Sequence, residues 1–384
     1  MRIAQVGSYP LSEDYICGGV EASVFGLTLA LAQIGHSVEV FDYPRIGGED
    51  TCEYSKNIII HRYSNAGRHN QSAIKRTTDI CRDILASQPD VVHIHGTGIV
   101  SGALYRLAKS AGISVILTVH GLLREEKRKA LLRQPSLKHI YQYIVQARAE
   151  KALLNAASPV IVDTQYVAQR IERYYDKYRL RQMPELHVIP QGINAEFFNH
   201  PCDEISRTIL CVGTITPRKG HIYTVDMFNR LKEWGINTRL RVIGAKADTA
   251  YYNRLKQYIQ RSPYCNDISL ETDVSQAELL SAYEHAKLFV LHSAEESQGI
   301  VFAQAMACGL PVVAANVGGV GNVVEHGRTG FLCDFGDTLT MAQMVKQLLS
   351  DDDLCKSFSG QARKAALKYN WNTIAEQILR LYKG

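Results

Sequence analysis

Residues 3–41 read IAQVGSYPLSEDYICGGVEASVFGLTLALAQIGHSVEVF, and this stretch decides the fold. It begins with the short apolar run Ile3–Val6 and ends with a second one, Val38–Phe41. Between the two runs, apolar residues recur at the spacing of one helix face: Val20, Val24, Leu27, Leu31 and Ile34. A strand, a helix and a strand in this order predict the first unit of a doubly wound parallel sheet.

The same alternation continues along the chain in two series. In the first series, further buried parallel strands are predicted at Val91–Ile94, Val115–Val119 and Val160–Val162. In the second series, strands are predicted at Ile209–Val212, Leu240–Ile243, Leu288–Leu291 and Pro311–Ala314. Helical segments between the second set include Ile222–Trp234 and Ile300–Ala307. We therefore predict an α/β protein with two Rossmann-like, doubly wound domains.

Turn-forming residues mark the boundary between the two series. Pro190, Gly192 and Pro201 cluster there. We predict a first domain over residues 1–195, a second over 196–366 and a C-terminal helix within 367–384. Ligands bind outside the carboxyl ends of the strands in open parallel sheets, so two facing sheets predict an interdomain cleft.

The composition excludes several classes of protein. Of the 384 residues, 46% are hydrophobic and 21% are charged, which is typical of a globular chain. The net charge of +5 is too small to indicate a nucleic-acid partner. Nine cysteines without a CxxC pair indicate reduced thiols and a cytoplasmic protein. We expect no membrane span, no secretory leader and a monomer or weak dimer.

The loop that follows the first strand of the second domain carries two adjacent cations. Gly213 ends the strand, and Arg218 and Lys219 stand just before the next helix. Positive charge at this point suits a leaving diphosphate, on which negative charge accumulates. The alternative is a solvated Arg-Lys pair at a turn.

Residues 293–313, SAEESQGIVFAQAMACGLPVV, form the most specific stretch of the chain. Glu296 is suited to accept hydrogen bonds from sugar hydroxyls. The amides of Gly299, Ile300 and Val301 are the unpaired donors of a predicted helix N-terminus, which favours sugar or phosphate oxygens. Gln304 lies one turn further along this helix.

Two features of the first domain also point to a ligand. Gly18 and Gly19 open its first helix, where backbone amides can approach an anion, although a simple turn is an equal alternative. His120 ends a strand and is suited to hydrogen-bond a sugar hydroxyl or a phosphate, although a lone histidine is more often structural. We expect at most one of His93 and His95 to reach the ligand, because side chains alternate faces along a strand.

Together these motifs resemble the retaining GT-B glycosyltransferases of family GT4 over nearly the whole chain. The motifs that carry the resemblance are Gly-Gly-Val-Glu at 18–21, Val-His-Gly at 119–121, Pro-Gln-Gly-Ile-Asn at 190–194, Pro-Arg-Lys-Gly at 217–220 and the segment at 296–304. The resemblance implies two Rossmann-like domains that face across a cleft, with the acceptor on the first and the nucleotide sugar on the second. It also implies a C-terminal helix that crosses back to the first domain.

The resemblance implies roles for individual residues. His120 corresponds to an active-site histidine near the donor sugar, and Arg218 and Lys219 to the pair that grips the diphosphate. Glu296 corresponds to the residue that contacts the transferred sugar, and Gln304 stands where a second glutamate usually binds the ribose. Gly18 and Gly19 correspond to the glycine loop that lies over the phosphates, and we expect Gly213 to help bind the donor. No metal and no cofactor other than the donor are implied.

Two positions depart from the family pattern and bear on the donor. Gln304 replaces glutamate, and a neutral amide offers the ribose both a donor and an acceptor. Thr214 stands where many members carry arginine, for which Arg218 is a substitute. We expect retuned donor binding rather than loss of the chemistry.

A basic segment in the first domain points to the acceptor. Residues 121–151 carry eight Lys and Arg against three Glu, a net charge of +5, with apolar residues interleaved. A second basic run spans residues 170–181. Such a surface suits an anionic membrane, at about 1 kcal/mol per cation, or is simply a solvated helix face.

The sequence therefore predicts a metal-independent, retaining glycosyltransferase that acts on a glycan or lipid-linked glycan in surface polysaccharide assembly. We expect it in the cytoplasm, peripheral on the inner face of the membrane. The alternatives are a non-catalytic protein that binds sugar nucleotides and a GT-B sugar-nucleotide epimerase.

Overall fold

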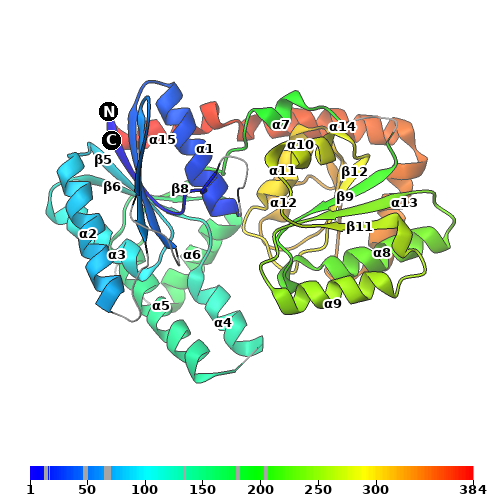
Figure 1. Ribbon diagram of the computed structural model, residues 1–384, viewed down its shortest axis with the longest axis horizontal. Coiled ribbons are helices and arrows are strands. Elements are labelled where there is room, and N and C mark those ends of the chain that lie inside the picture. Colours follow the sequence, from blue (N-terminus) through cyan, green and yellow to red (C-terminus); the bar gives the residue numbers. More distant parts are fainter. Residues whose placement is uncertain are drawn as a thin grey trace. The chain divides into compact units, whose positions relative to one another are not determined.

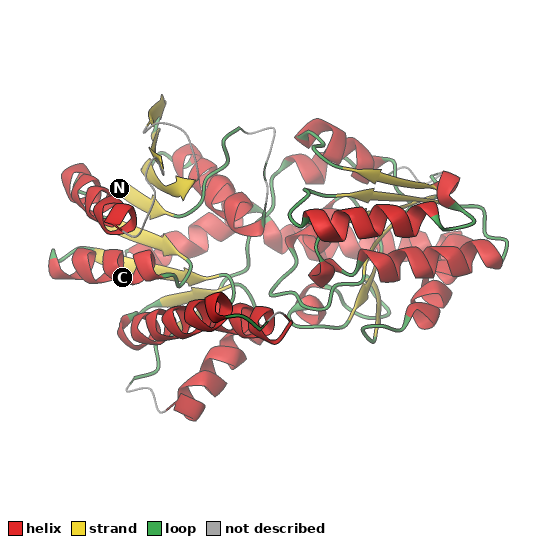
Figure 2. Cartoon of the chain, turned by 60° about the horizontal axis from the view of Figure 1, so that its bottom comes forward, coloured by secondary structure: helices red, strands yellow, loops and turns green. Residues whose placement is uncertain are grey.

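The computed structural model describes residues 1–12, 16, 18–45, 51–64, 71–133, 135–178, 182–202 and 206–383. The chain forms two compact units, which are described one at a time. Unit 1 comprises Met1–Tyr9, Val20–Pro190 and Asn372–Gly384, and unit 2 comprises Pro10–Gly19 and Gln191–Trp371. In both units, helices cover the two faces of a mostly parallel sheet (Figures 1 and 2).

Unit 1 is built from alternating strands and helices. Its strands are β1 (Arg2–Val6), β2 (Ser37–Arg45), β3 (Thr51–Ser55), β4 (Ile58–Ser64), β5 (Val91–His95), β6 (Ser114–Val119), β7 (Val160–Val162) and β8 (Leu186–Val188). Its helices are α1 (Gly19–Gln33), α2 (Gln71–Ser87), α3 (Ile99–Ser110), α4 (Leu123–Arg133), α5 (Leu137–Ala156), α6 (Gln165–Tyr178) and, from Asn372 onward, α15 (Trp371–Tyr382).

The sheet of unit 1 has the strand order β3-β4-β2-β1-β5-β6-β7-β8 among the described residues. The order reverses direction between β1 and β5, and the carboxyl ends of these two strands meet there. Different helices cover the two faces of this sheet. Val92 and Ile94 pack in a core with side chains of α3 and α5, whereas Gln5 and His93 turn the other way, toward α1 and α15.

Unit 2 repeats the same plan with shorter strands. Its strands are β9 (Thr208–Val212), β10 (Arg239–Ile243), β11 (Ile268–Glu271), β12 (Leu288–Leu291), β13 (Val312–Ala315) and β14 (Gly330–Cys333). Its helices are α7 (Glu196–Asn199), α8 (His221–Glu233), α9 (Thr249–Gln260), α10 (Gln276–Glu284), α11 (Ile300–Ala307), α12 (Val320–Val323), α13 (Thr338–Ser350) and α14 (Asp352–Ala366).

All paired strands of the unit 2 sheet are parallel in the described part of the chain, in the order β11-β10-β9-β12-β13-β14. The order reverses between β9 and β12. Because the connections leave a reversal point on opposite sides, the loops after β9 and β12 diverge at the carboxyl edge of the sheet, where ligands bind in open parallel sheets.

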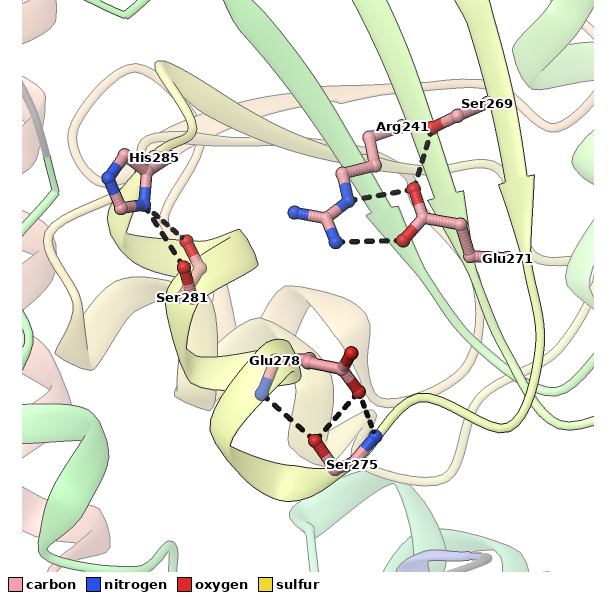
Figure 3. A network of polar contacts seen from close by, with 7 residues as sticks. All are labelled: Arg241, Ser269, Glu271, Ser275, Glu278, Ser281 and His285. Carbon is pink, nitrogen blue, oxygen red and sulfur yellow. Dashed lines mark hydrogen bonds and ion pairs between the residues drawn. The ribbon is translucent and has the colours of Figure 1, made fainter.

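Short-range polar contacts stabilise α10 and the β10–β11 edge of the unit 2 sheet (Figure 3). The Ser275 hydroxyl caps α10 by accepting from the Glu278 amide, and the Glu278 carboxylate accepts from the Ser275 amide in return. Arg241 of β10 donates two hydrogen bonds, of 2.9 and 2.7 Å, to the Glu271 carboxylate of β11. These contacts stabilise the start of α10 and the pairing of β10 with β11.

The doubly wound α/β fold predicted from the sequence is confirmed. The predicted strand Val160–Val162 matches β7 residue for residue, and α15 lies within the C-terminal helix predicted at 367–384. The helix expected after the first strand is α1, but its predicted apolar face is only partly buried. Val24, Leu27 and Leu31 lie in the core, whereas Val20 and Ile34 are exposed.

Candidate active site

A buried ion pair lies at the strand reversal of unit 2. Lys219 follows β9 and Glu296 follows β12, and the Lys219 Nζ lies 2.6 Å from Glu296 Oε1. The Ser293 hydroxyl donates to the same oxygen over 2.7 Å. Lys219 is 8% exposed and Glu296 is 4% exposed, so both charges are shielded from bulk water. Two residues that the sequence placed in separate motifs are thus direct partners.

Arg218 is the exposed cation of this cluster. Its guanidinium lies 3.9 Å from Glu296 Oε2 and donates to the Glu295 carbonyl, while 40% of the side chain stays exposed. Burial alone would raise the pKa of Glu296, but the charges of Lys219 and Arg218 lower it below the ordinary value. The carboxylate therefore stays ionised, and the cluster keeps a net positive charge.

Two glycines hold the ion pair in place. Gly220 ends the short 3-10 turn of Pro217–Lys219 with φ 66°, and a Cβ there would lie 2.0 Å from the His292 carbonyl oxygen. Gly318 has φ 57°, and its Cβ would lie 2.0 Å from the Glu296 carbonyl oxygen. Only glycine permits both this backbone conformation and this close approach. Gly318 was not among the predicted site residues.

The helix that follows Glu296 begins where the sequence predicts. α11 starts at Ile300 after Gly299, which adopts φ 77° at the N-cap. The amides of Ile300 and Val301 therefore belong to the first turn of a helix, the position at which backbone donors lack intrahelical partners. Gly213 packs against the stem of Lys219, with 3.5 Å between a Cβ built on the glycine and the lysine Cδ.

Among the described residues, the Gln304 side chain has a hydrogen-bond partner at its carbonyl oxygen only. Its Oε1 accepts from the Tyr283 hydroxyl over 3.3 Å. Tyr283 is fully buried, and burial raises its pKa well above the ordinary value, so the hydroxyl remains a donor. The Gln304 side chain is therefore oriented with its amide nitrogen directed elsewhere.

His120 in unit 1 is held by two other side chains. Its Nδ1 lies 3.1 Å from Asp163 Oδ2, and its Nε2 lies 3.1 Å from His95 Nδ1. Only 8% of the His120 side chain is exposed. We expected this histidine to donate to a sugar or phosphate, but both ring nitrogens already have protein partners. Neither Asp163 nor the pairing with His95 was predicted.

The expectation that His93 and His95 point to opposite faces was wrong. Residues two positions apart in a strand share a face, and the two rings stack with centroids 4.3 Å apart. Both are buried. His93 bonds to Tyr382 of α15 and to Thr118, so it serves the interior of unit 1.

Two further features complete the placement of the candidate residues. Gly18 precedes α1 and Gly19 is its first residue, and a Cβ at Gly18 would meet nothing within 4 Å.

Glu150, which we counted only as a surface charge, is fully buried and accepts from Thr97 Oγ1 over 2.9 Å. Burial raises the pKa of Glu150 to about 7. Leu153 and Leu154, one turn further along α5, are buried as well, so Glu150 lies on the inner face of this helix.

Comparisons with known proteins agree with this geometry. A family model described as Glycosyltransferase Family 4 matches residues 17–197, and one described as Glycosyl transferases group 1 matches residues 193–365. The chain belongs to the family 4 glycosyltransferases. This glycosyltransferase is 24% identical to a D-inositol 3-phosphate glycosyltransferase of Paenarthrobacter aurescens, over 95% of its own length and 93% of that protein.

Solved structures share the GT-B fold of this glycosyltransferase. Sucrose-phosphate synthase of Thermosynechococcus elongatus superposes with a TM-score of 0.80 at 22% identity, over 100% of this chain and 98% of that one. HepE of Anabaena, solved in complex with UDP-glucose, gives 0.75 at 18% identity, over 100% and 99%. The protein is thus an enzyme that transfers a sugar from a nucleotide donor.

Proposed function

We propose that this enzyme is a retaining glycosyltransferase that needs no metal and transfers a sugar to a glycan or lipid-linked glycan. The observation that carries the proposal is the buried Lys219–Glu296 pair with Arg218 beside it. Fixed cations at a strand reversal supply the positive charge that a departing nucleoside diphosphate requires. The similarity of the fold to UDP-glucose-bound HepE supports a nucleotide-sugar donor on unit 2.

Each residue has a distinct part in the proposed reaction. The bond between the sugar and the diphosphate breaks through an oxocarbenium-like state, and negative charge accumulates on the diphosphate. Arg218, Lys219 and the first amides of α11 stabilise that charge. Glu296 keeps Lys219 in position through Oε1 and accepts from sugar hydroxyls through Oε2. The departing phosphate then takes the proton of the acceptor hydroxyl on the same face of the sugar.

Nucleotide release tests the proposed function directly. We expect one of UDP-, GDP- or ADP-sugars to raise the melting temperature of the purified protein, since ligand at 100 times its Kd stabilises by about 2.7 kcal/mol. With that donor and a glycan acceptor, the protein should release the nucleoside diphosphate and form a glycosidic bond of retained configuration. Binding without release for any acceptor would favour the non-catalytic alternative. An epimerised sugar nucleotide as product would favour the epimerase.

We propose that the acceptor is presented at an anionic membrane. On α5, five exposed side chains recur at intervals of three and four residues and form one stripe: Leu137, Tyr141, Ile144, Arg148 and Lys151. The stripe combines exposed apolar side chains with cations, the residue types by which a helix binds an anionic lipid surface. Among the helices that the structure describes, none is long and apolar enough to cross a bilayer. The enzyme would then be peripheral on the cytoplasmic face.

The second basic run contributes less to this surface than its sequence suggests. Arg170 forms an ion pair with Glu125 of α4, so its charge is already partly neutralised. Arg179 and Arg181 lie outside the described residues. The α5 stripe therefore carries more of the membrane proposal than this second run does.

Vesicle flotation tests the α5 stripe. We expect the protein to float with anionic vesicles at low salt and to be released as salt screens the charges. Arg148→Gln/Lys151→Gln should weaken binding about 30-fold, at about 1 kcal/mol for each cation. The matched control is Arg254→Gln/Lys256→Gln, which removes two exposed cations from α9 of unit 2. Equal binding by both variants, or no binding by the wild type, would contradict the membrane proposal.

A further inference from the structure

The side chain of Gln298 is bonded at both ends to the main chain of Gln191. The Gln191 amide donates to Gln298 Oε1 over 2.7 Å, and Gln298 Nε2 donates to the Gln191 carbonyl over 3.1 Å. Gln298 is 1% exposed and Gln191 is 8% exposed, so both hydrogen bonds are shielded from water. A main-chain amide only donates and a main-chain carbonyl only accepts, so the two partners determine which end of the side chain faces each of them.

Gln298 lies in the turn that is proposed to bind the donor. Residues 296–301, here called the donor turn, carry the Glu296 carboxylate and the first amides of α11. The main chain of Glu296 is held from one side, because its carbonyl accepts from the Gly319 amide over 2.9 Å. Gln298 supplies a second point of attachment, two residues further along the donor turn.

The other end of this contact lies where the chain passes between the two units. Gln191 begins the long segment of unit 2, and Trp371 ends it. A Cβ built on Gly192 would overlap the Trp371 ring, and the Ile193 amide donates to the Tyr369 carbonyl over 2.7 Å. The two connecting segments, residues 191–193 and 369–371, are therefore packed together within unit 2.

We propose that Gln298 is a positioning residue that ties the donor turn to the connecting segments. Burying a carboxamide costs free energy unless its polar ends are bonded, so an apolar side chain would serve better if Gln298 only filled space. Both ends of Gln298 are bonded, and both to one main-chain residue 107 positions away. No role was predicted for Gln298 from the sequence.

This inference rests on the proposed function, because it takes the donor turn as the place where the sugar and the diphosphate bind. A donor that reaches Glu296 and the α11 amides meets a turn that is already held in place, so less ordering accompanies binding. Segments that connect two domains absorb the change in backbone angles when domains move. The Gln298 contact therefore joins the donor turn directly to such segments.

Gln298→Met removes the tie and keeps the bulk of the side chain. Methionine is unbranched and about as long as glutamine, but it makes neither hydrogen bond. The matched control is Thr238→Val, which removes a buried hydrogen bond from the Thr238 hydroxyl to the Arg207 carbonyl. These two residues precede β10 and β9, at the amino edge of the same sheet. Both variants should lose stability, and only Gln298→Met should alter the donor turn.

Donor affinity is the first measurement. Isothermal titration calorimetry uses the full-length protein and the UDP-, GDP- or ADP-sugar that raises its melting temperature most. The Kd of Gln298→Met should rise about tenfold, as expected when the ordering of a few groups must accompany binding, and that of Thr238→Val should stay within about twofold of the wild type. A wild-type Kd for Gln298→Met would overturn the proposal.

Amide hydrogen exchange of the ligand-free protein is the second measurement. The Gly319 amide bonds to the donor turn and the Ile193 amide bonds to Tyr369, so they report on the two sides of the tie without bonding to Gln298. Both should exchange at least about tenfold faster in Gln298→Met and at the wild-type rate in Thr238→Val. Faster exchange at Gln191 alone, the amide that loses its acceptor directly, would overturn the proposal.

The outcomes also distinguish this inference from the proposed function. If no acceptor supports transfer but both amides exchange faster in Gln298→Met, the proposed function fails and the tie stands. If the wild type transfers sugar and both measurements are unchanged in Gln298→Met, the tie fails and the proposed function stands. Should Gln298→Met not fold, Gln298→Asn, whose amide is one methylene too short to reach both partners, carries the same two expectations.

Discussion

Lys219→Ala is expected to lower the kcat of sugar transfer by about 10³-fold, the size of the loss when one fixed donor to developing negative charge is removed. The lysine Nζ is within 2.6 Å of Glu296 at the strand reversal of unit 2, where the diphosphate is proposed to leave. Release of the nucleoside diphosphate at saturating donor measures the effect. Glu296→Ala should reduce transfer as severely, because it removes the sugar contact and leaves Lys219 without its main partner.

The buried pair also contributes to stability, so the measurement needs a control. Removing one partner of such a pair costs about 3–5 kcal/mol, because the other charge stays buried. Thermal unfolding should therefore accompany each assay. Lys287→Ala is the matched variant: it removes another largely buried lysine, whose Nζ lies 2.8 Å from Asp352, outside the site. Near-normal transfer by Lys219→Ala or Glu296→Ala, or an equal loss in Lys287→Ala, would refute the assignment.

Gly220→Ala is expected to lower the free energy of unfolding by about 4 kcal/mol, more than most single substitutions do. The added Cβ would stand 2.0 Å from the His292 carbonyl oxygen, which belongs to the backbone and cannot rotate away. The φ of 66° adds a cost of its own, about 1–2 kcal/mol for a residue with a side chain. Denaturant unfolding of the purified variant measures the change.

Gly235 offers the matched control for this prediction. It has a similar φ of 74°, but a Cβ built there meets nothing within 4 Å. Gly235→Ala should therefore show only the conformational cost, about 1–2 kcal/mol. If the two variants lose equal stability, the close approach between Gly220 and His292 does not hold the Lys219 loop in place.

The elements of the fold could be predicted because each carries its own local pattern. Val160–Val162 is a short apolar run and was found to the residue, and α15 has a clear apolar face and lies within the predicted C-terminal helix. The loops after β9 and β12 were also recognised, because glycine, cations and a carboxylate follow an apolar run. The parallel order of the strands then brings these loops together at one edge.

The partners of the candidate residues could not be predicted in the same way. His120 bonds to His95 and Asp163, which are 25 and 43 positions away in the sequence, and no local pattern links them. The ion pair of Lys219 with Glu296 spans 77 positions. Glu150 lies on the inner face of α5, and its hydrogen bond from Thr97, 53 positions away, could not be read from the sequence. Which distant side chains form pairs depends on the order of the strands in the sheet, and no local sequence pattern reveals that order.

The hydrogen bond from Tyr283 determines which hydrogen-bonding groups Gln304 would offer a nucleotide at that position. Tyr283 engages one of the two lone pairs of the Gln304 carbonyl oxygen, so the side chain has two amide hydrogens and one lone pair left for a ligand. A glutamate in its place would offer only lone pairs. At the proposed ribose position, the amide hydrogens would thus bind lone pairs of the ribose hydroxyls, a contact that an ionised glutamate does not make.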